Sequence, residues 1–365
     1  MNIDYICIWG KNKKQTWSGT SYSLYEALSK IMDVNDKGFM LSKFEKVLIK
    51  SGSIIFNNHI NILSTIIPRL HLKFLIGESK NTQLQIGDIS KSHSKYYIYQ
   101  DLSIDSLIEL KEKDKRAFTF SNYQNISNKN LYIRNRWQKN IYQNSAGIFT
   151  MSQWLAESLV HFSGIDKNKV HHVGGGINID SSKITNFSKS NNKILFVGRD
   201  FQRKAGYQVY EAFKILIEKY DENAELYIVG PSENPLNDAI KNVKFIGDIS
   251  REELVNYYNM CDIFCMPSYF EAYGLVFIEA LAFGLPVFGR NKFAMKEFIE
   301  EGYNGYLIED DDYDEWALKL FDLLNNQRIK ENVKSQQQKY IHDYSWDTVA
   351  TRIKNIMDKD CKNNL

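Results

Sequence analysis

Two cations on one short segment are the first residues in this chain that could do chemistry. Arg199 and Lys204 belong to the segment Gly198–Lys204, which directly follows the apolar run Lys193–Val197. An arginine offers a planar fork of donors and a lysine a compact charge, so the two together suit a pyrophosphate. A solvated turn has the same composition, and the segment alone does not separate the two interpretations.

A second segment carries carboxylates next to the start of a helix. Pro267–Ala280 is typical of a strand end, a loop and a helix that begins near Gly274. At the helix start, the backbone N–H groups of Gly274, Leu275 and Val276 would point outward without intrahelical acceptors. A phosphate binds well at such a position. Glu271 would lie in the loop and Glu279 in the second helical turn, so both could face one ligand. The alternative is an acidic residue beside the helix dipole and a solvated helix residue.

The elements that must position these segments alternate regularly between strand and helix. Apolar runs predict strands at 193–197, 225–229, 243–246, 263–266 and 285–288, and helices at 206–220, 252–260, 275–283, 295–301, 313–325 and 346–358. Such alternation predicts a parallel, doubly wound α/β sheet, which binds ligands outside the carboxyl ends of its strands.

The N-terminal half shows a less regular pattern. We expect a strand at 3–9, a loop at 10–19 and a helix at 22–31, then strands at 54–56, 74–76, 96–99, 146–152 and 169–173 and helices at 102–111, 130–143 and 153–163. The polar stretch Asp180–Asn192 is the best linker. It divides the chain into an N-terminal domain (1–180), a C-terminal domain (181–345) and a terminal helix (346–365).

The charge of the chain is unevenly distributed. The net charge of +2 separates into about +8 for residues 1–180 and about −6 for 181–365. A basic half suits an anionic partner such as a membrane surface, a phosphorylated acceptor or a nucleic acid, although an uneven solvated surface fits equally well. The four cysteines form no Cys-x-x-Cys pair, and no apolar run is long enough to cross a bilayer. We therefore expect a cytoplasmic protein, without a signal peptide, whose membrane contact would be peripheral.

An ordered set of motifs resembles a known family. In sequence the motifs are Gly198-Arg-x4-Lys204, Leu226-Tyr-Ile-Val-Gly230, Val243-Lys-Phe-Ile-Gly247, Cys261–Ser268, Glu271-x7-Glu279, Gly284-Leu-Pro-Val287, Glu297 and Gly302-Tyr-Asn-Gly305. Over residues 145–325 they are similar to the retaining GT-B glycosyltransferases of glycosyltransferase family 4. The resemblance implies two Rossmann-like doubly wound domains that face each other across a cleft. They would be an acceptor-binding N-terminal domain (1–180) and a nucleotide-sugar-binding C-terminal domain (181–345), with the terminal helix (346–365) crossing back to the first domain.

The resemblance also implies roles for single residues. Arg199 and Lys204 would hold the donor diphosphate and stabilise the leaving group, Glu279 would bind the ribose and Glu271 the transferred sugar. Gly19 would approach the diphosphate from the other domain. Two departures concern the pocket: Ser18 stands where the family has a further glycine, and Phe293-Ala294 replaces a Gly-Gly pair before Glu297.

We accordingly predict a retaining, metal-independent glycosyltransferase. It would use a UDP- or GDP-sugar as substrate, with no further cofactor, and a carbohydrate or lipid-linked acceptor, in surface polysaccharide or lipopolysaccharide synthesis. Asp101 is the best N-terminal candidate to reach the reacting centre, although an N-cap role in the following helix is favoured. The alternatives are a non-catalytic partner subunit of the same fold and a nucleotide-sugar epimerase.

Three other segments are interpreted as structural. The acidic run Glu309–Asp314 has the spacing of a metal-binding Asp-x-Asp but is typical of a helix N-terminus, so no metal site is predicted. Asn130–Lys139 interleaves aromatic and basic residues, yet an ordinary amphipathic helix is favoured over a membrane or nucleic-acid surface. His171 and His172 would face opposite sides of a strand and cannot share a metal.

Overall fold

The computed structural model describes residues 2–55, 62–76, 79–185, 192–236 and 240–362. The chain divides into two compact units, unit 1 (Met1–Gly176 with Ser345–Leu365) and unit 2 (Ile177–Tyr344). The unit boundaries follow residues 176 and 344, where the sequence predicts domain ends at 180 and 345.

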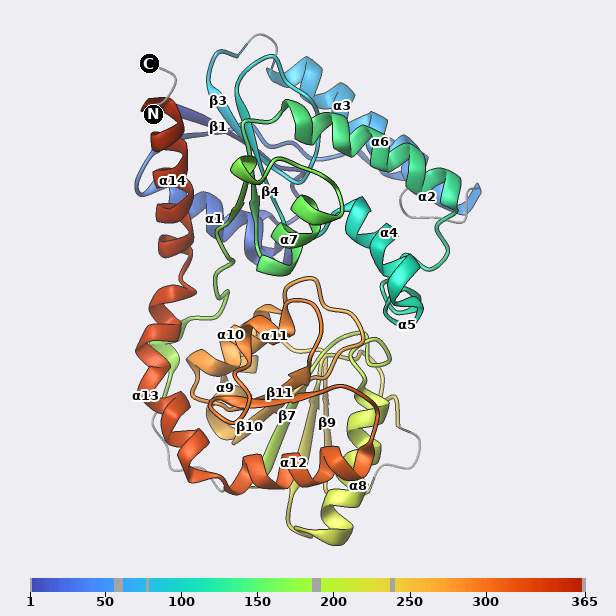
Figure 1. Cartoon of the computed structure of the whole chain (residues 1–365), viewed down its shortest axis with the longest axis vertical. Coiled ribbons are helices and arrows are strands. Elements are labelled where there is room, and N and C mark those ends of the chain that lie inside the picture. The colour runs from blue at the N-terminus through green and yellow to red at the C-terminus, as the bar shows by residue number, and fades with distance from the viewer. Residues whose placement is uncertain (1, 56–61, 77–78, 186–191, 237–239, 363–365) are drawn as a thin grey trace. The chain divides into compact units, whose positions relative to one another are not determined.

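Unit 1 contains a parallel sheet with the strand order β2-β1-β3-β4-β5-β6 (Figure 1). Its strands are β1 (Asn2–Ile6), β2 (Asp33–Asp36), β3 (Thr82–Ile86), β4 (Tyr96–Gln100), β5 (Gly147–Thr150) and β6 (Val170–His172). The helices are α1 (Thr20–Ser29), α2 (Lys43–Ile55), α3 (Ile62–Ile76), α4 (Ile104–Lys113), α5 (Lys115–Thr119), α6 (Asn128–Asn144), α7 (Gln153–His161) and α14 (Trp346–Lys362). Both faces of β4 are buried, which explains its uninterrupted apolar and aromatic run.

Two strands predicted for unit 1 are wrong. Residues 54–55 end helix α2, residue 56 lies outside the described residues, and residues 74–76 end helix α3. An apolar run of three residues fits a strand and a helix turn equally well, so the pattern was ambiguous. The second and third strands of the unit are instead the polar segments β2 and β3. Their composition does not favour a strand, but their pairing with β1 stabilises them as strands.

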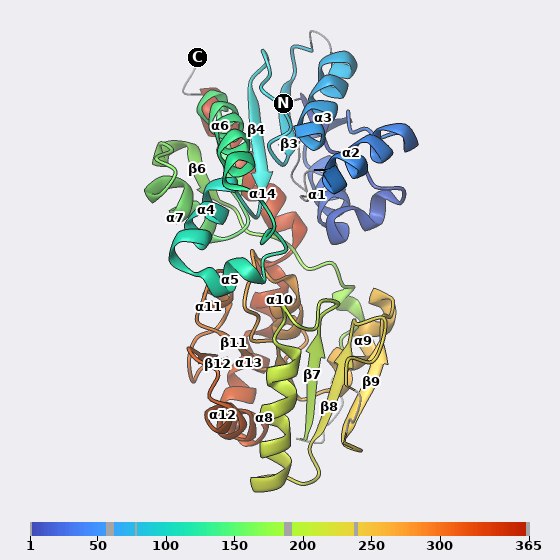
Figure 2. The same ribbon diagram turned by 90° about the vertical axis from the view of Figure 1, so that its right-hand side faces the viewer.

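Unit 2 contains the second parallel sheet, with the order β12-β11-β10-β7-β8-β9. Its strands are β7 (Lys193–Val197), β8 (Glu225–Val229), β9 (Val243–Gly247), β10 (Ile263–Cys265), β11 (Val287–Arg290) and β12 (Gly305–Ile308). Helices cover both faces of the sheet (Figure 2), namely α8 (Gly206–Lys219), α9 (Arg251–Met260), α10 (Leu275–Ala282), α11 (Met295–Phe298), α12 (Tyr313–Asn325) and α13 (Gln327–Asp343). The two units confirm the predicted α/β class.

The order of the strands in unit 2 locates its switch point. The chain proceeds from β7 through β8 to β9 on one side, and then starts again with β10 on the other side of β7. Helices after β7 and β10 therefore lie on opposite faces, and the loops at the carboxyl ends of these two strands diverge. Ligands of doubly wound sheets bind at this position.

Helix α14 completes the core of unit 1 from the far end of the chain. Its side chains at positions 349, 350, 353 and 357 are fully buried, and the helix packs against α1. The Tyr97 hydroxyl donates to Asp360 Oδ2 at 2.6 Å, and Arg352 Nη1 donates to the Val173 carbonyl at 3.0 Å. The terminal helix is therefore an integral part of this unit.

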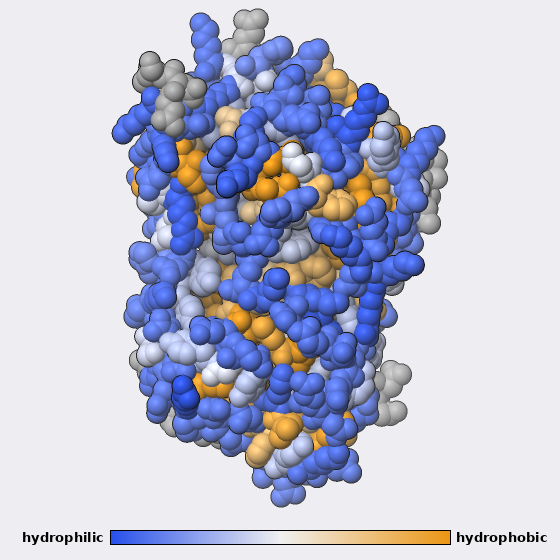
Figure 3. All heavy atoms as spheres, viewed as in Figure 1, coloured by the Kyte–Doolittle hydropathy of each residue, from blue (hydrophilic) through white to orange (hydrophobic). Residues whose placement is uncertain are grey.

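One face of the molecule is predominantly polar. The face in Figure 3 is covered mainly by hydrophilic residues, with hydrophobic residues in separate areas. Among the helices that the structure describes, none combines the length and the apolar character needed to cross a bilayer.

Candidate functional site

The loop after β7 lies at the switch point of unit 2 and carries the two predicted cations. β7 is buried along its centre, and the chain leaves it at Gly198 to begin α8 at Gly206. A Cβ atom on Gly198 would lie 2.7 Å from Lys204 Cγ, so glycine is needed for the loop to fold back on the lysine. Ala205, with φ of 60°, makes the left-handed turn into α8.

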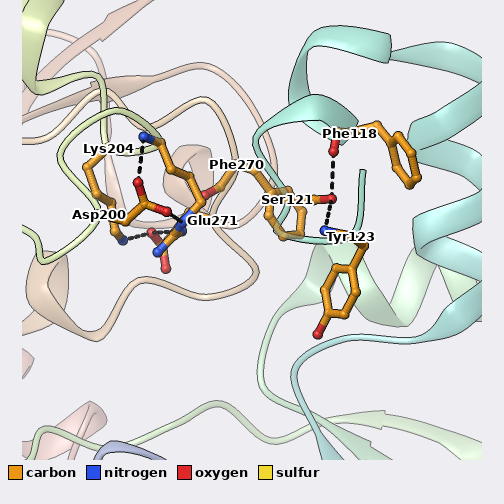
Figure 4. A network of polar contacts seen from close by, with 8 residues as sticks. Phe118, Ser121, Tyr123, Asp200, Lys204, Phe270 and Glu271 are labelled. Atoms are coloured by element: carbon orange, nitrogen blue, oxygen red, sulfur yellow. Dashed lines mark hydrogen bonds and ion pairs between the residues drawn. The ribbon is translucent and has the colours of Figure 1, made fainter. Parts of the chain in front are cut away.

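Lys204 and Glu271 form an ion pair between the two predicted segments (Figure 4). Lys204 is 8% exposed, and its Nζ donates to Glu271 Oε2. Burial lowers the pKa of Lys204, and the neighbouring Glu271 carboxylate acts against that shift. The folded chain therefore joins residues 67 positions apart into one charged centre.

Arg203 extends this charged centre and was not predicted. Its guanidinium lies 3.6 Å from Glu271 Oε2, and Nη1 donates to the Phe270 carbonyl at 2.9 Å. Asp200 Oδ2 accepts from its Nε at 3.3 Å. Its position beside Lys204 in the same cationic segment was the available signal.

Arg199 lies on the exposed side of the same loop. Its Nη2 and Nε donate to Asp248 Oδ1 at 3.0 and 3.2 Å, and 79% of its side chain is exposed. Asp248 follows β9, so this pair spans the loops after β7 and β9. An exposed pair of this kind contributes little to stability and leaves the guanidinium accessible to a ligand.

The loop after β10 leads into α10 through Gly274. Gly274 is the N-cap of α10 and has φ of 97°, which a residue with a side chain rarely adopts. A Cβ atom there would lie 3.1 Å from Glu271 Cγ, so Glu271 packs against the start of the helix. The N–H groups of Leu275 and Val276 belong to the first turn of α10, where an α-helix leaves donors without intrahelical acceptors.

Glu279 is buried in the second turn of α10, so its interpretation as a solvated helix residue is wrong. It is 6% exposed, and its carboxyl accepts from the Asn178 N–H and the Tyr258 hydroxyl, both at 3.3 Å. Burial raises its pKa to about 7, although the Asn178 N–H, Arg251 and Tyr258 lower it in part. Asn178 and Tyr258 hold this carboxyl in one orientation, and neither was predicted.

Arg290 supports the loop that carries Glu271. Its side chain is 4% exposed; Nη2 binds Asp311 Oδ1 at 2.7 Å, and Nε donates to the Pro267 carbonyl at 3.3 Å. The guanidinium lies over the ring of Tyr269, whose hydroxyl donates to Asp311 Oδ2 at 2.8 Å. Arg290 is the last residue of β11. An arginine at the carboxyl end of a strand is the feature of the sequence that could have indicated this contact.

The acidic run after β12 has structural roles. Besides Asp311 in the Arg290 pair, Asp312 is the N-cap of α12 and accepts from the Glu315 N–H, and Asp314 pairs with Lys219 at 2.6 Å. The described residues contain no group of three or more His, Cys, Asp or Glu side chains that could hold a metal ion.

The predicted residues of unit 1 lie at the carboxyl ends of its strands. Gly19 follows β1, is buried, and is the N-cap of α1 with φ of 83°. Asp101 follows β4. Its interpretation as an N-cap is wrong, because Ser103 caps α4 and accepts from the Ser106 N–H at 3.0 Å.

Two other segments of unit 1 are placed by local contacts. In the loop after α5 the Ser121 hydroxyl donates to the Phe118 carbonyl at 2.7 Å and accepts from the Tyr123 N–H at 3.2 Å (Figure 4). Helix α6 is the expected amphipathic helix: Arg134 pairs with Asp88 at 2.6 Å, and Lys139 lies 3.3 Å from Asp105.

Comparison with known proteins shows which family part of this chain matches. Residues 178–340, nearly all of unit 2, match the model of the family described as glycosyl transferases group 1. Together with the two parallel sheets, this match gives the chain a GT-B fold that resembles the glycosyltransferases of family 4.

Two relatives and one solved structure show how similar this chain is to individual proteins. The chain is 31% identical over 180 residues to an uncharacterized 41.2 kDa protein in the cps region of Klebsiella pneumoniae, covering 46% of this chain and 48% of that protein. It is 24% identical to the capsular polysaccharide biosynthesis glycosyltransferase CapM of Staphylococcus aureus, over 54% of this chain and 57% of that one. The fold matches HepE of Anabaena, solved in complex with UDP-glucose, with a TM-score of 0.65 at 14% identity over 98% of this chain and 100% of that chain. The chain thus spans about half the length of the curated relatives it matches.

Proposed function

We propose that this protein is a glycosyltransferase that moves a sugar from a UDP- or GDP-sugar to a carbohydrate or lipid-linked acceptor. The observation that carries the proposal is the meeting of the Gly198–Lys204 loop, Glu271 and the start of α10 at the switch point of unit 2. Doubly wound sheets bind nucleotides at this position. The GT-B fold shared with HepE, which was solved with UDP-glucose, supports the same class of donor.

The proposed donor site matches the charges of a nucleoside diphosphate. The Arg199 guanidinium and the Lys204 ammonium would take the diphosphate together with the N–H groups of Gly274, Leu275 and Val276. Glu279 would accept hydrogen bonds from the ribose, and Glu271 would contact the transferred sugar. No metal ion is needed in this scheme, because the side chains and the helix start carry the opposing charge.

The proposed reaction retains the anomeric configuration. The bond between the anomeric carbon and the leaving β-phosphate oxygen breaks, and a bond from the acceptor hydroxyl oxygen forms on the same face. The hydroxyl proton passes to the leaving diphosphate, so no protein nucleophile is required.

The relatives suggest the biological setting. CapM is a capsular polysaccharide biosynthesis glycosyltransferase, and the Klebsiella protein is named for the cps region. We therefore place the proposed reaction in the synthesis of a surface polysaccharide or a related glycolipid.

The experiment is a thermal-shift screen with UDP, GDP and their sugars. One nucleotide at about 100 times its Kd should stabilise the protein by about 2.7 kcal/mol. Arg199→Ala should remove most of this gain while costing less than about 1 kcal/mol of stability, because the residue is exposed. Lys244→Ala is a matched control, since Lys244 also lies in an exposed pair, 3.9 Å from Glu225.

Further outcomes separate the proposal from its alternatives. A response to no nucleotide would exclude the donor site, and binding without transfer would favour a non-catalytic subunit. Conversion of the free nucleotide-sugar to its epimer would identify an epimerase. A product of inverted configuration would contradict retention, and loss of transfer in EDTA would contradict metal independence.

A further inference from the structure

Unit 2 contains a pocket of about 610 Å³ that is separate from the proposed donor site. One wall consists of residues 296–300, 303 and 304, which lead from α11 toward β12, and the other is the carboxyl-terminal part of α13 (Figure 1). Arg199, Lys204, Glu271 and Glu279 do not line it. Its volume lies within the range of about 300–1,000 Å³ that is typical of small-molecule sites, so the pocket could hold a ligand of its own.

Helix α13 presents polar side chains to this pocket. Gln336 and Tyr340 both line it, and because they are four residues apart they lie on one side of the helix. The side-chain amide of Gln336 is half-buried and makes no hydrogen bond with the residues that the structure describes. The amide can therefore both donate to a ligand and accept from it.

The buried Asn304 side chain holds the two walls together. It is 4% exposed; Oδ1 accepts from the Glu300 N–H at 2.8 Å, and Nδ2 donates to the Phe298 carbonyl at 2.9 Å. Nδ2 also donates to the Tyr340 hydroxyl of α13 at 3.2 Å. The pocket is thus formed before a ligand arrives, and binding requires little ordering of the protein.

The same contact leaves the Tyr340 hydroxyl as a donor. Burial raises the pKa of Tyr340, so the hydroxyl keeps its proton at neutral pH. Its oxygen accepts from Asn304, and its proton has no acceptor in the described part of the chain. That proton is therefore available to a ligand in the pocket.

The charges of the lining balance one another. Lys296 and Lys339 contribute two positive charges, and Glu297 and Glu300 contribute two negative ones, so the formal charge of the lining is zero. A phosphate or a carboxylate would gain no net attraction here. A neutral ligand with several hydroxyl groups can donate to the carboxylates and accept from the lysines, because each hydroxyl is both a donor and an acceptor.

Tyrosines add aromatic surface to this polar lining. Tyr303, Tyr340 and Tyr344 all line the pocket. A tyrosine ring offers a broad apolar face with a polar group at one end, and a sugar ring likewise combines apolar C–H groups with hydroxyls at its edge. Tyr303 belongs to the motif Gly302-Tyr-Asn-Gly305, which has no part in the proposed donor site.

We propose that this pocket is a second binding site, which takes a neutral mono- or oligosaccharide. The Tyr340 hydroxyl and the Gln336 amide bind hydroxyl groups of the sugar, and a tyrosine ring packs against its C–H groups. The site binds sugar without a nucleotide and has no part in the transfer step. Only its consequence, which is to retain a glycan on unit 2, rests on the proposed function.

The test is saturation-transfer NMR of the full chain with neutral mono-, di- and trisaccharides of glucose, galactose, mannose and N-acetylglucosamine. We expect at least one of these sugars to bind. Gln336→Ala and Tyr340→Phe should each weaken its binding by about fivefold, because each variant removes one hydrogen bond to the ligand.

Matched controls lie elsewhere in unit 2. Gln338→Ala removes an exposed glutamine of the same helix, and Tyr220→Phe removes the hydroxyl of a tyrosine that is 38% exposed. Both variants should bind the sugar like the unmodified protein. Glu271→Gln should also retain sugar binding, because Glu271 lies outside this pocket. Circular dichroism would verify that the pocket variants remain folded.

Three results would overturn the proposal. They are no binding of any of these sugars, sugar binding that neither Gln336→Ala nor Tyr340→Phe weakens, and binding of glucose 1-phosphate at least about tenfold more tightly than glucose. Sugar binding that the pocket variants weaken, in a protein that responds to no nucleotide, would contradict the proposed function and support this inference.

Discussion

The candidate site contains two buried ionisable residues, Lys204 and Glu279, whose partners differ. Lys204 has a direct partner in Glu271, whose carboxylate acts against the lowering of the Lys204 pKa by burial. Glu279 receives hydrogen bonds from Asn178 and Tyr258 but has no comparable ion pair among the described contacts. Burial therefore dominates, and the pKa of Glu279 rises to about 7. Ionising this carboxyl at neutral pH costs free energy, which a bound ribose hydroxyl could offset.

The Glu279→Gln variant should reveal this cost as a pH dependence. The folded-state pKa of about 7 lies above the ordinary value of 4.5, so the contribution of Glu279 to stability is complete below 4.5 and is lost as pH rises through 7. Relative to Glu279→Gln, the unmodified protein should lose on the order of 3 kcal/mol between these values.

The measurement is urea unfolding of both proteins from about pH 4.5 to about pH 8, following the transition of unit 2. Glu271→Gln is an informative comparison, because that residue is paired with Lys204. Parallel pH profiles for the unmodified protein and Glu279→Gln would show that the carboxyl is not perturbed.

At the scale of the elements, the site depends on close contacts between the ends of strands. Gly230 follows β8 with φ of 121°, and a Cβ atom on it would lie 2.6 Å from the Gly198 carbonyl carbon. Gly198 N–H donates to the Val229 carbonyl at 2.8 Å, and Gly230 N–H to the Gly247 carbonyl at 2.8 Å. The loops after β7, β8 and β9 are therefore held in register by backbone contacts that leave no room for a side chain.

Gly230→Ala should accordingly disturb both stability and ligand binding. Adverse φ and the clash with Gly198 together should cost about 3 kcal/mol or more. The nucleotide response should weaken as well, because the displaced backbone carries Arg199. Denaturant unfolding and the thermal-shift titration measure the two effects.

Gly302→Ala is the matched control for this substitution. Gly302 also has positive φ, at 72°, but nothing lies within 4 Å of its Cβ position. It should cost only about 1 kcal/mol and leave nucleotide binding unchanged. Equal effects of the two substitutions would show that the contact with Gly198 is unimportant.

At the scale of the whole molecule, each unit has its own core, but unit 1 is assembled from both ends of the chain. Ile353 of α14 is fully buried in unit 1, and a Cβ atom on Gly176 would lie 2.6 Å from the Trp346 ring. Removing buried contacts of α14 should therefore act on residues more than 170 positions away.

Ile353→Ala should destabilise unit 1 by about 2–5 kcal/mol through the cavity it leaves. Hydrogen exchange should become faster in residues 1–176, while the nucleotide response of unit 2 persists. Asn355→Ala, an exposed position of the same helix, should change stability by less than about 0.5 kcal/mol. Faster exchange confined to unit 2 would contradict the assignment of α14 to unit 1.

Several features could be predicted from the sequence because they are local. The apolar residues of unit 2 recur at the spacings expected for alternating strands and helices. Gly198 and the two cations follow strand β7, and Glu271 and Gly274 follow strand β10. A parallel sheet places such loops at one edge whatever the other elements do. In unit 1 the apolar runs 54–56 and 74–76 are too short to show a periodicity. Residues 54–55 and 74–76 belong to helices and not to the predicted strands.

The sequence by itself determined the α/β class, the alternation in unit 2 and the two loops that carry Arg199, Lys204, Glu271 and Glu279. Only the tertiary structure decided which charges meet: Lys204 with Glu271, Arg199 with Asp248, and Arg290 with Asp311. It also decided that Glu279 is buried and that α2 and α3 leave apolar side chains exposed. The physical reason is that a residue's local pattern sets its backbone conformation, whereas its burial and its ion-pair partners depend on the order in which distant strands pair.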